Sequence, residues 1–446
     1  MDELWTNLGP EVINISYTGS RSIIHRVIQI DFSSISAFLT GFSTYPQPLR
    51  LRLRIFTIFF LYKQTHQAVR KGELSTIMKL VFDKADLVKS VAIAMKAVSG
   101  KTTMPILQCI LIDASSSQIK FTSNDMELGI ETLVTGMILE RGVVALDAKI
   151  FSEIVRKLPD NQVTIETDEN LVTTITCEKA KFNIPGQSGE DFSYLPILET
   201  SDCVSISQFT LKELIRQTIF SIAANENNKL MTGELFEIKD NTLRVVSLDG
   251  HRIAIRKIEL KESYPDRKVV VPGKTLNEIS KILSGETEDQ IDIYFSDNHI
   301  MFKFDDTTVV SRLIDGEYFR IDQMLSSDYE TKVTINKKEF LSCIDRATLL
   351  VKEGDKKPII IDIQDGAMEL QINSAMGSMK EEIDITKEGK DIMIGFNPKF
   401  LIDALRVIDD EEISIYLVNP KAPCFIRNEE ESYIYLILPV NFNSVR

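Results

Sequence analysis

The sequence is poor in the residues that hold metals and disulfide frameworks. Five of its 446 residues are cysteines and four are histidines. Neither a CxxC pair nor a Cys/His cluster is present, and disulfide scaffolds and zinc sites both depend on such spacings. We therefore expect a reduced, cytoplasmic protein without a bound metal or cofactor. The cysteines are Cys109, Cys177, Cys203, Cys343 and Cys424.

Long hydrophobic runs are also lacking. The apolar run at 55–62 is far shorter than the ~18 residues that a membrane-spanning helix needs. It also lies too deep in the chain to be a secretory signal. The sequence thus predicts a protein without a membrane partner.

The chain has no excess of basic residues, because its formal net charge is −14. A protein that holds DNA by simple attraction is usually basic, since it must neutralise phosphates. This chain therefore either ignores nucleic acid or holds it by some means other than net charge. The length predicts about three domains of roughly 150 residues.

Residues 1–77 differ in character from the rest. They contain Trp5, the only tryptophan, and their eight Lys/Arg and five Asp/Glu give a charge of +3, so the remainder carries −17. We interpret them as an extension outside the fold, either disordered or due to a start codon placed too far upstream. A basic, apolar surface helix is the alternative. The patterned sequence begins at Met78.

From Met78 onward the chain repeats itself three times. An apolar strand, a polar turn and an amphipathic helix begin at 82–87, 206–211 and 335–340, with offsets of 124 and 129. A second strand-to-helix pattern lies at 144–149, 269–274 and 394–399, with both offsets 125. Each second pattern ends on a lysine followed by apolar residues on one helical face.

Turn residues separate short apolar segments between these helices, as antiparallel hairpins require. Clear examples are 119–122 with 128–134, and 243–248 with 252–258. Each repeat should therefore hold two helices and about eight short strands, an α+β fold with antiparallel sheets. The predicted organisation is an extension at 1–77 and three repeated domains at 78–200, 201–328 and 329–446.

Two segments resemble catalytic motifs without completing them. The SGKTT sequence at 99–103 ends like a phosphate-binding loop, but Met95 stands where that loop needs its first glycine. Asp249 and His251 are spaced for acid–base work, yet neither GxSxG nor HExxH accompanies them, and Asp-Gly is typical of a hairpin turn. The acid runs at 409–412 and 429–431 lack metal-ligand spacing and are interpreted as solvated turns. The sequence predicts that the protein is not an enzyme.

From Met78 to about Phe442, the chain resembles the beta subunits of bacterial DNA polymerase III, the sliding clamps. The resemblance rests on an ordered set of short motifs together with the threefold repeat. These motifs are Met78-Lys79-Leu80, Met104-Pro105-Ile106-Leu107, Ser123-Asn124-Asp125-Met126-Glu127-Leu128, Asp249-Gly250-His251-Arg252, Gly395-Phe396-Asn397 and Leu438-Pro439-Val440.

The resemblance implies a non-catalytic processivity factor, a head-to-tail ring of two chains around duplex DNA. Helix geometry supports the stoichiometry, because neighbouring helices lie ~9 Å apart. Six helices would leave a bore under ~10 Å, whereas twelve would leave about 24 Å, enough for a duplex roughly 20 Å wide. A closed ring holds DNA by topology, so an acidic body is tolerable if the lining is basic. The lysines expected to face DNA are Lys101, Lys149, Lys229, Lys274 and Lys399.

The same resemblance implies a groove that binds short Leu/Phe-containing peptides of the replicative polymerase, the clamp loader and repair proteins. An apolar cleft with a few polar rim groups suits such an extended peptide. The matching residues are Leu248, Asp249, Gly250, His251, Arg252, Ile253, Phe319, Met324, Asn397, Phe400, Leu436, Leu438, Pro439 and Val440. Phe319 stands where many members have proline, and Asn443 to Arg446 extend beyond the usual end.

For the ring interface, the resemblance points to Phe182 and Ile184 on one side and to Leu349 and Leu350 on the other. Lys181 would face Glu381 and Glu382, a pairing that specifies orientation more than it adds affinity. Two other classes of function stay open at this stage. One is a repeat scaffold that binds only proteins, and the other is a hydrolase or kinase built around His251 or Lys101.

Overall fold

The computed structural model describes residues 78–442 except 101, 199–202, 225–227 and 352–356. The expectations for residues 1–77, for Lys101 and for the tail after Phe442 therefore lie outside the described residues. None of the helices described is both long and apolar enough to cross a membrane.

The first strand-to-helix pattern forms as predicted in all three repeats. Asp83, Ser207 and Asn336 each precede a helix, and their side chains accept hydrogen bonds from backbone N–H groups of its first turn. These N–H groups have no partner within the helix, so such capping fixes where each helix begins. The three units are β1 (Met78–Asp83) with α3 (Lys84–Ala94), β10 (Cys203–Ser207) with α5 (Gln208–Thr218), and β16 (Thr331–Asn336) with α7 (Lys337–Thr348).

The second pattern also forms in each repeat. Asp147 and Asn397 cap their helices through the side chain, whereas Pro272 has no side chain that can do so. In all three helices the lysine predicted from the repeat is the second residue. The units are β6 (Val143–Asp147) with α4 (Ala148–Lys157), β12 (Arg252–Pro272) with α6 (Gly273–Ser280), and β21 (Ile392–Phe396) with α8 (Pro398–Val407).

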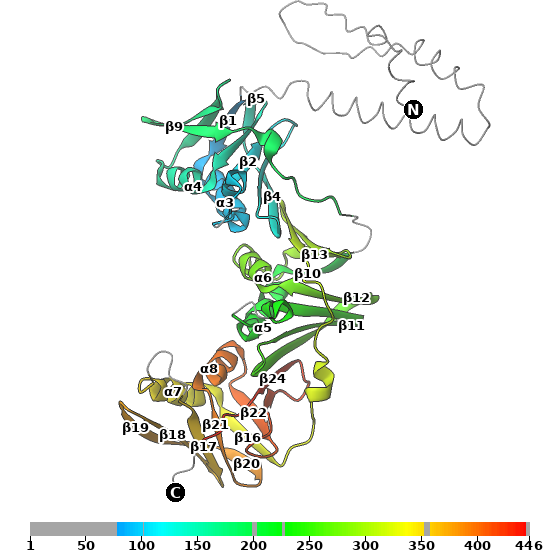
Figure 1. Cartoon of the computed structure of the whole chain (residues 1–446), viewed down its shortest axis with the longest axis vertical. Helices are drawn as coiled ribbons and strands as arrows, with labels where there is room; N and C mark the ends of the chain where they lie inside the picture. Colours follow the sequence, from blue (N-terminus) through cyan, green and yellow to red (C-terminus); the bar gives the residue numbers. More distant parts are fainter. Residues whose placement is uncertain (1–77, 101, 199–202, 225–227, 352–356, 443–446) are drawn as a thin grey trace, which may run out of the picture. The chain divides into compact units, whose positions relative to one another are not determined.

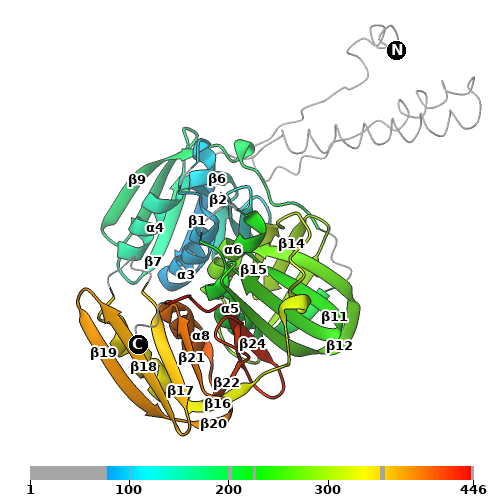
Figure 2. The same cartoon turned by 60° about the horizontal axis from the view of Figure 1, so that its bottom comes forward.

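The two helices of each repeat lie side by side, α3 with α4, α5 with α6, and α7 with α8 (Figure 1), and Figure 2 shows the first two pairs from another side. The strands between them pair antiparallel, which confirms the predicted α+β fold class. The first repeat adds β2 (Cys109–Asp113), β3 (Ile119–Asn124), β4 (Leu128–Val134), β5 (Met137–Glu140), β7 (Gln162–Thr167), β8 (Val172–Cys177) and β9 (Ala180–Gln187). The second adds β11 (Gly233–Leu248), β13 (Gln290–Phe295), β14 (His299–Phe304) and β15 (Thr307–Arg312). The third adds β17 (Ile359–Gln364), β18 (Ala367–Ser374), β19 (Gly377–Asp384), β20 (Thr386–Gly389), β22 (Glu412–Leu417), β23 (Cys424–Arg427) and β24 (Tyr433–Ile437).

Both predicted hairpins are present, with Ile119 paired to Val134 and Leu248 to Ile253. The second repeat has fewer separate strands than expected, because β11 and β12 run on as long strands. Their register shifts on both sides of Asp240, whose φ of 51° lies in the left-handed region. An extra residue in one strand of a ladder produces such a shift.

The sheets continue from one repeat into the next. In a 13-stranded sheet β15 of the second repeat pairs with β4 of the first, and in a 7-stranded sheet β12 pairs with β24 of the third. A 4-stranded sheet in the order β19-β18-β17-β21 completes the third repeat. Backbone hydrogen bonds therefore join the three repeats.

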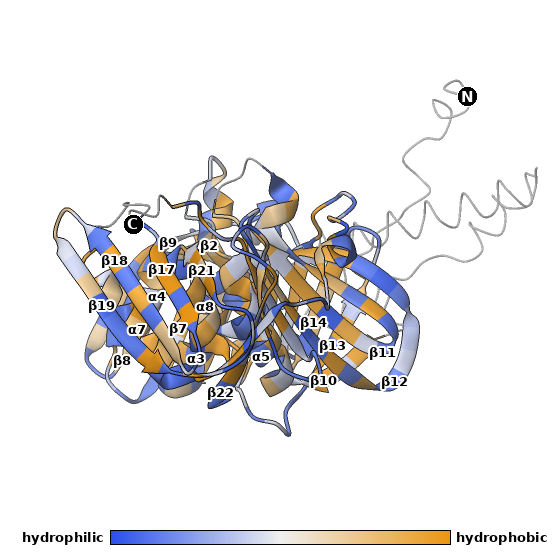
Figure 3. Ribbon diagram, turned by 90° about the horizontal axis from the view of Figure 1, so that it is seen from below, coloured by the Kyte–Doolittle hydropathy of each residue, from blue (hydrophilic) through white to orange (hydrophobic). Residues whose placement is uncertain are grey.

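Each repeat has an apolar core between its helices and its sheet. In the first, the ring of Phe121 packs edge-on against Phe82 and Phe151, with centroids 6.0 and 6.1 Å apart. In the third, β17 and β21 are largely hydrophobic and buried, whereas β19 at the sheet edge is largely hydrophilic (Figure 3). The pattern follows from packing one sheet face against the helices while the edge meets solvent.

One acidic side chain, Glu234 of β11, is fully buried in the second repeat. Burial raises its pKa to about 8, and neither of its carboxyl oxygens has a hydrogen-bond partner among the described residues. A buried carboxyl group is much more stable in its neutral form, because the charged form loses its hydration. The folded chain therefore favours protonated Glu234.

This burial predicts a pH-dependent stability. Below the pKa of an unfolded glutamate, about 4.3, both states bind the proton and Glu234 adds no pH dependence to the free energy of unfolding. As the pH rises from there to about 8, unfolding releases that proton, so the free energy of unfolding falls until the folded-state pKa is passed. Glu234→Gln should remove this fall and stabilise the protein at pH 8 by on the order of 3–5 kcal/mol. Chemical denaturation of both proteins at pH 5 and pH 8 measures the difference, and equal pH dependence would contradict the assignment.

Candidate functional site

Three exposed lysines occupy equivalent places in the repeats. Lys149, Lys274 and Lys399 are each the second residue of a helix, namely α4, α6 and α8. Lys149 and Lys399 form no ion pair with any described residue. Lys229 is exposed too, in a short helical turn that Asn228 caps by accepting from the Leu230 N–H at 3.1 Å. These side chains are available to bind an anion.

Lys274 differs from its two counterparts, because its ammonium is ion-paired to Asp125 of the first repeat. The Asp125 carboxylate is nearly buried and also accepts from the backbone N–H groups of Glu127 (3.0 Å) and Leu128 (2.7 Å). Lys274 thus ties helix α6 to the turn between β3 and β4. The positive charge of Lys274 is therefore partly neutralised within the chain.

A second site is an apolar cluster that spans the second and third repeats, here called the outer cluster. Leu248, Ile253 and Leu436 lie opposite one another on β11, β12 and β24, and all three are buried. Its buried members are Leu235, Val246, Leu248, Ile253, Ile255, Val270, Tyr318, Ile321, Tyr416, Phe425, Ile434 and Leu436, with Leu230, Met231, Ile314, Phe319 and Leu325 packed against them. Four residues predicted for the peptide groove, from three distant segments, are therefore brought together: Leu248, Ile253, Phe319 and Leu436.

The turn from Leu248 to Arg252 closes this cluster at one end. The Asp249 carboxylate accepts from the backbone N–H groups of His251 (3.0 Å) and Arg252 (3.2 Å) and also binds the Arg252 Nε at 3.0 Å. Gly250 adopts a φ of 86°, which a residue with a Cβ atom rarely adopts. Asp249 is thus committed to the turn and to Arg252, and does not orient His251 for catalysis.

The Arg252 side chain connects the second repeat to the third. Its Nη1 binds Asp403 Oδ2 at 2.7 Å, its Nη2 donates to the Phe220 carbonyl at 2.6 Å, and its guanidinium lies 4.6 Å from the Phe400 ring centroid. Arginine suits such a buried site, because its planar group can donate in several directions and stack on a ring at once. Arg252 thus holds the turn against the third repeat through partners within the chain.

The C-terminal segment lies beside the same turn. The N–H of Leu438 donates to the carbonyl of His251, and that of Val440 to the carbonyl of Gly395, both at 2.8 Å. Asn397 caps helix α8, and its carbonyl accepts from the Phe400 N–H at 3.1 Å. The His251 and Phe400 rings are 5.9 Å apart. The polar and apolar rim residues predicted for the groove, with Pro439 between Leu438 and Val440, are therefore neighbours.

Met324, another residue predicted for the groove, lies outside the buried part of the outer cluster. Its side chain is 53% exposed and is not among the residues packed into the outer cluster. The adjacent Ile321 and Leu325 are in the cluster instead. Sequence reasoning also missed Leu230, Met231 and Tyr318, because they lie in a short helical turn and a connecting segment without periodic spacing.

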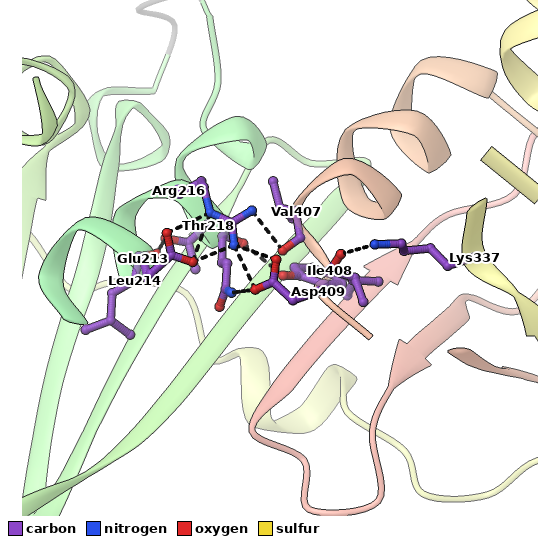
Figure 4. A network of polar contacts seen from close by, with 10 residues as sticks. Glu213, Leu214, Arg216, Thr218, Lys337, Val407, Ile408 and Asp409 are labelled. Carbon is purple, nitrogen blue, oxygen red and sulfur yellow. Dashed lines mark hydrogen bonds and ion pairs between the residues drawn. The ribbon is translucent and has the colours of Figure 1, made fainter. Parts of the chain in front are cut away.

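The second and third repeats are also joined on the side of α5 by the polar network in Figure 4. Arg216 binds Asp409 Oδ2 at 2.9 Å and Glu213 Oε1 at 2.9 Å, and donates to the Val407 carbonyl at 3.2 Å. Lys337 donates to the Ile408 carbonyl at 2.6 Å. The acidic turn at 409–412 is thus more than a solvated turn, since its first residue holds the junction.

The residues predicted for an interface lie on two strands and one helix end. β19 is the outermost strand of its sheet, and β9 pairs with β6 only at Gly186 and Gln187. Phe182 is exposed and Ile184 buried on β9, while Leu349 at the end of α7 is 75% exposed and Leu350 packs on the third core. Lys181 and Glu382 are exposed and form no ion pair with any described residue.

Glu381 differs from Glu382, because it is bound within its own chain. Arg346 Nε lies 3.0 Å from Glu381 Oε2, and this contact holds the pKa of Glu381 below its usual value. Its carboxylate is therefore less available to Lys181 than the sequence suggested.

Metal ligands and reactive thiols were the remaining candidates for chemistry in the described part of the chain. There, no group of three or more His, Cys, Asp or Glu side chains is placed to hold a metal ion. Burial raises the pKa of Cys109 to about 11 and those of Cys343 and Cys424 to about 12. These thiols stay protonated at neutral pH, and the thiolate is the nucleophilic form.

Three family models match the chain in succession. They are the N-terminal domain of the DNA polymerase III beta subunit at residues 78–196, the central domain at 205–319 and the C-terminal domain at 322–441. The beta sliding clamps of Staphylococcus epidermidis and Staphylococcus aureus are 34% and 35% identical over 357 residues, which is 78% of this chain and 94% of theirs.

Solved structures agree with these matches. A protein described as a DNA polymerase III beta subunit from Eubacterium rectale is 70% identical, with a TM-score of 0.80 over 82% of this chain and 100% of its own. The DNA polymerase sliding clamp of Bacillus subtilis is 35% identical, with a TM-score of 0.79 and the same coverage. The chain therefore belongs to the DNA polymerase III beta subunit family and is a sliding clamp of DNA replication, a processivity factor without catalytic activity.

Proposed function

We propose that two copies of this chain close head to tail around duplex DNA in the cytoplasm, each contributing three domains at 78–200, 201–328 and 329–446. The observation that supports this most is the threefold equivalence of α4, α6 and α8, each with an exposed lysine at its second residue. The six helices of one chain would line too small a bore, whereas the twelve helices of two chains admit a duplex. Lys149 and Lys399, and to a lesser degree Lys229, then face the phosphates.

Encirclement reconciles the acidic chain with DNA binding. A closed ring does not depend on attraction for retention, so negative charge elsewhere on the surface costs little. Lys274, whose charge Asp125 already partly neutralises, contributes less to DNA contact than Lys149 and Lys399. It acts chiefly to hold the first and second repeats together.

The outer cluster supports a second part of the proposal, the binding of partner peptides. Apolar side chains from three segments meet at a rim that also presents His251, Asn397 and Leu438. An extended peptide with Leu or Phe anchors fits such a cleft, because buried apolar anchors supply most of the binding free energy. The partners are the replicative polymerase, the clamp loader and repair proteins.

A protein-only scaffold using the same groove is the rival function, and retention on DNA separates the two. Loaded onto nicked circular DNA, the protein should stay bound at high salt and be lost when the circle is linearised.

Lys149→Glu with Lys399→Glu should keep this retention but lower the salt dependence of loading. Each phosphate contact contributes about 0.9 to the slope of the logarithm of the binding constant against the logarithm of the salt concentration, and the variant loses such contacts. Gel filtration of the loaded DNA, before and after linearisation, measures retention, and loading at a series of salt concentrations gives the slope.

Lys179→Glu with Lys421→Glu is the matched control, because both lysines are exposed and form no ion pair with a described residue. This control should load as the wild type does. Equal retention on circular and linear DNA would reject encirclement in favour of the scaffold.

The interface assignment predicts a loss of dimer from a change at Leu349. Leu350 packs against the core of the third repeat, so changing it could unfold the domain. The test is therefore confined to Leu349, which is 75% exposed. Leu349→Lys would place an unpaired charge in an apolar interface, at a cost of several kcal/mol. Sedimentation should show a shift from dimer to monomer for this variant. Met137→Lys, a similarly exposed change on β5, should leave the dimer intact, and an unchanged Leu349→Lys dimer would refute the interface.

The groove assignment predicts that Leu438→Asp strongly weakens peptide binding. Leu438 is 37% exposed at the rim, so the fold should tolerate the change, while a charge there opposes burial of a Leu/Phe anchor. Affinity for a peptide ending in Leu and Phe should fall roughly 30-fold or more, as for an interface hot spot. Met393→Asp, at 38% exposure on β21, is the matched control and should bind normally. Fluorescence anisotropy gives both affinities, and equal loss in the two variants would disprove the assignment.

A further inference from the structure

A cavity of about 570 Å³ lies next to the outer cluster. Its walls come from β11 and β12, from the turn between β13 and β14, and from the connecting segment 313–323. The volume falls in the range of about 300–1,000 Å³ that is usual for ligand pockets. Leu235, Val270, Tyr318 and Ile321 line this cavity and are also buried members of the outer cluster, and Phe319 packs against them. The cavity and the groove therefore share one apolar floor.

The charges inside the cavity largely balance one another. Arg244 binds Glu237 at 2.6 Å and Asp322 at 2.7 Å, and Lys268 binds the other oxygen of Glu237 at 2.6 Å. These two cations and two carboxylates leave no surplus for a ligand. A phosphate or carboxylate ligand would have to displace one of these ion pairs.

The mouth of the cavity, in contrast, has an excess of negative charge. Asp297 and Asp315 line it, both are exposed, and neither forms an ion pair with a described residue. Glu317 pairs with Arg320 at 3.5 Å, although both side chains remain mostly exposed. A hydrogen bond from the Leu313 N–H to the Asn298 carbonyl, at 2.9 Å, ties together the two segments that bear Asp297 and Asp315. Asp297 and Asp315, the exposed carboxylates of the lining that are here taken to mark the mouth, thus have no ion-pair partner among the described residues.

We propose that this cavity binds a Lys- or Arg-bearing extension of the same partner peptides whose Leu/Phe anchors occupy the groove. The inference rests on the proposed peptide groove and adds a charge preference to it. The long aliphatic stem of Lys or Arg packs on apolar walls such as Leu235 and Val270, while its head reaches the carboxylates at the mouth. An acidic extension meets like charge there and is disfavoured.

The test compares peptides that share one Leu/Phe anchor and differ only in three flanking residues. Lysine and glutamine extensions are placed in turn before and after the anchor, since the direction of the chain in the groove is part of the question. In one of the two placements, the lysine peptide should bind the full-length protein roughly three- to tenfold more tightly than its glutamine counterpart at low salt. The advantage should shrink in high salt, because exposed pairs are screened.

Asp297→Asn with Asp315→Asn should abolish this advantage and leave the affinity of the glutamine peptides unchanged. The matched control is Asp160→Asn with Glu169→Gln, which removes the same charge from exposed positions of the first repeat. It should retain the advantage, which separates the cavity from the general attraction of an acidic protein for lysine.

The outcomes distinguish the two levels of the proposal. If no peptide binds the wild type, the groove itself is rejected. If all peptides bind with equal affinity, or if both double variants reduce the lysine advantage equally, the groove stands and the cavity assignment is overturned.

Discussion

Strand β24 pairs with β12 over Arg252 to Arg256, which sets Ile437 opposite Arg252 and Leu436 opposite Ile253. Side chains alternate between the faces of a strand, so this register decides which residues share the outer face. A slip by one residue would turn Leu436 to the opposite face and separate it from Ile253 and Leu248. The proposed groove, the Arg252 contacts to Asp403 and Phe220, and the position of Leu438 beside His251 all depend on this ladder.

Many charged side chains of this protein are paired within the chain. The chain outside residues 1–77 has a formal charge of −17, yet many of its carboxylates form ion pairs that hold parts of the chain together. Asp125 holds Lys274, Asp409 holds Arg216, and Glu381 is held by Arg346. A net charge therefore says little about the potential at a particular face, which depends on the charges left without a partner. Among the described residues, Lys149, Lys399, Asp297 and Asp315 are such charges.

Much of the fold was predictable from the sequence, because its signals are local. The offset of 125 residues located the second helix of each repeat, and Asp147 and Asn397 cap two of those helices as short polar residues do. The joins between repeats were not predictable, since β12–β24 pairing connects residues about 180 positions apart and has no sequence signature of its own. The same holds for the partner of Lys274, which lies 149 residues away.

The candidate site was predictable to the extent that it lies on regular strands. Leu248, Ile253 and Leu436 follow the alternation of side chains along a strand. Met324 and the neighbouring Ile321 and Leu325 lie in or next to a short helical turn, where the sequence has no regular spacing that predicts which side chains are buried. Glu234 could not be recognised as a buried acid, because a single glutamate beside apolar residues is ordinary on a surface strand. Its surroundings come from α5 and β11 together.

The ladders that cross the repeat boundaries have a mechanical consequence. Five residue pairs join β15 to β4, and five join β12 to β24. To hinge at either boundary, the chain would have to break several backbone hydrogen bonds at once and expose their groups to water, which makes both boundaries stiff. A force that pulls on the two ends of one subunit is therefore transmitted through it rather than absorbed. The compliant points of any assembly built from such subunits are the contacts between separate chains.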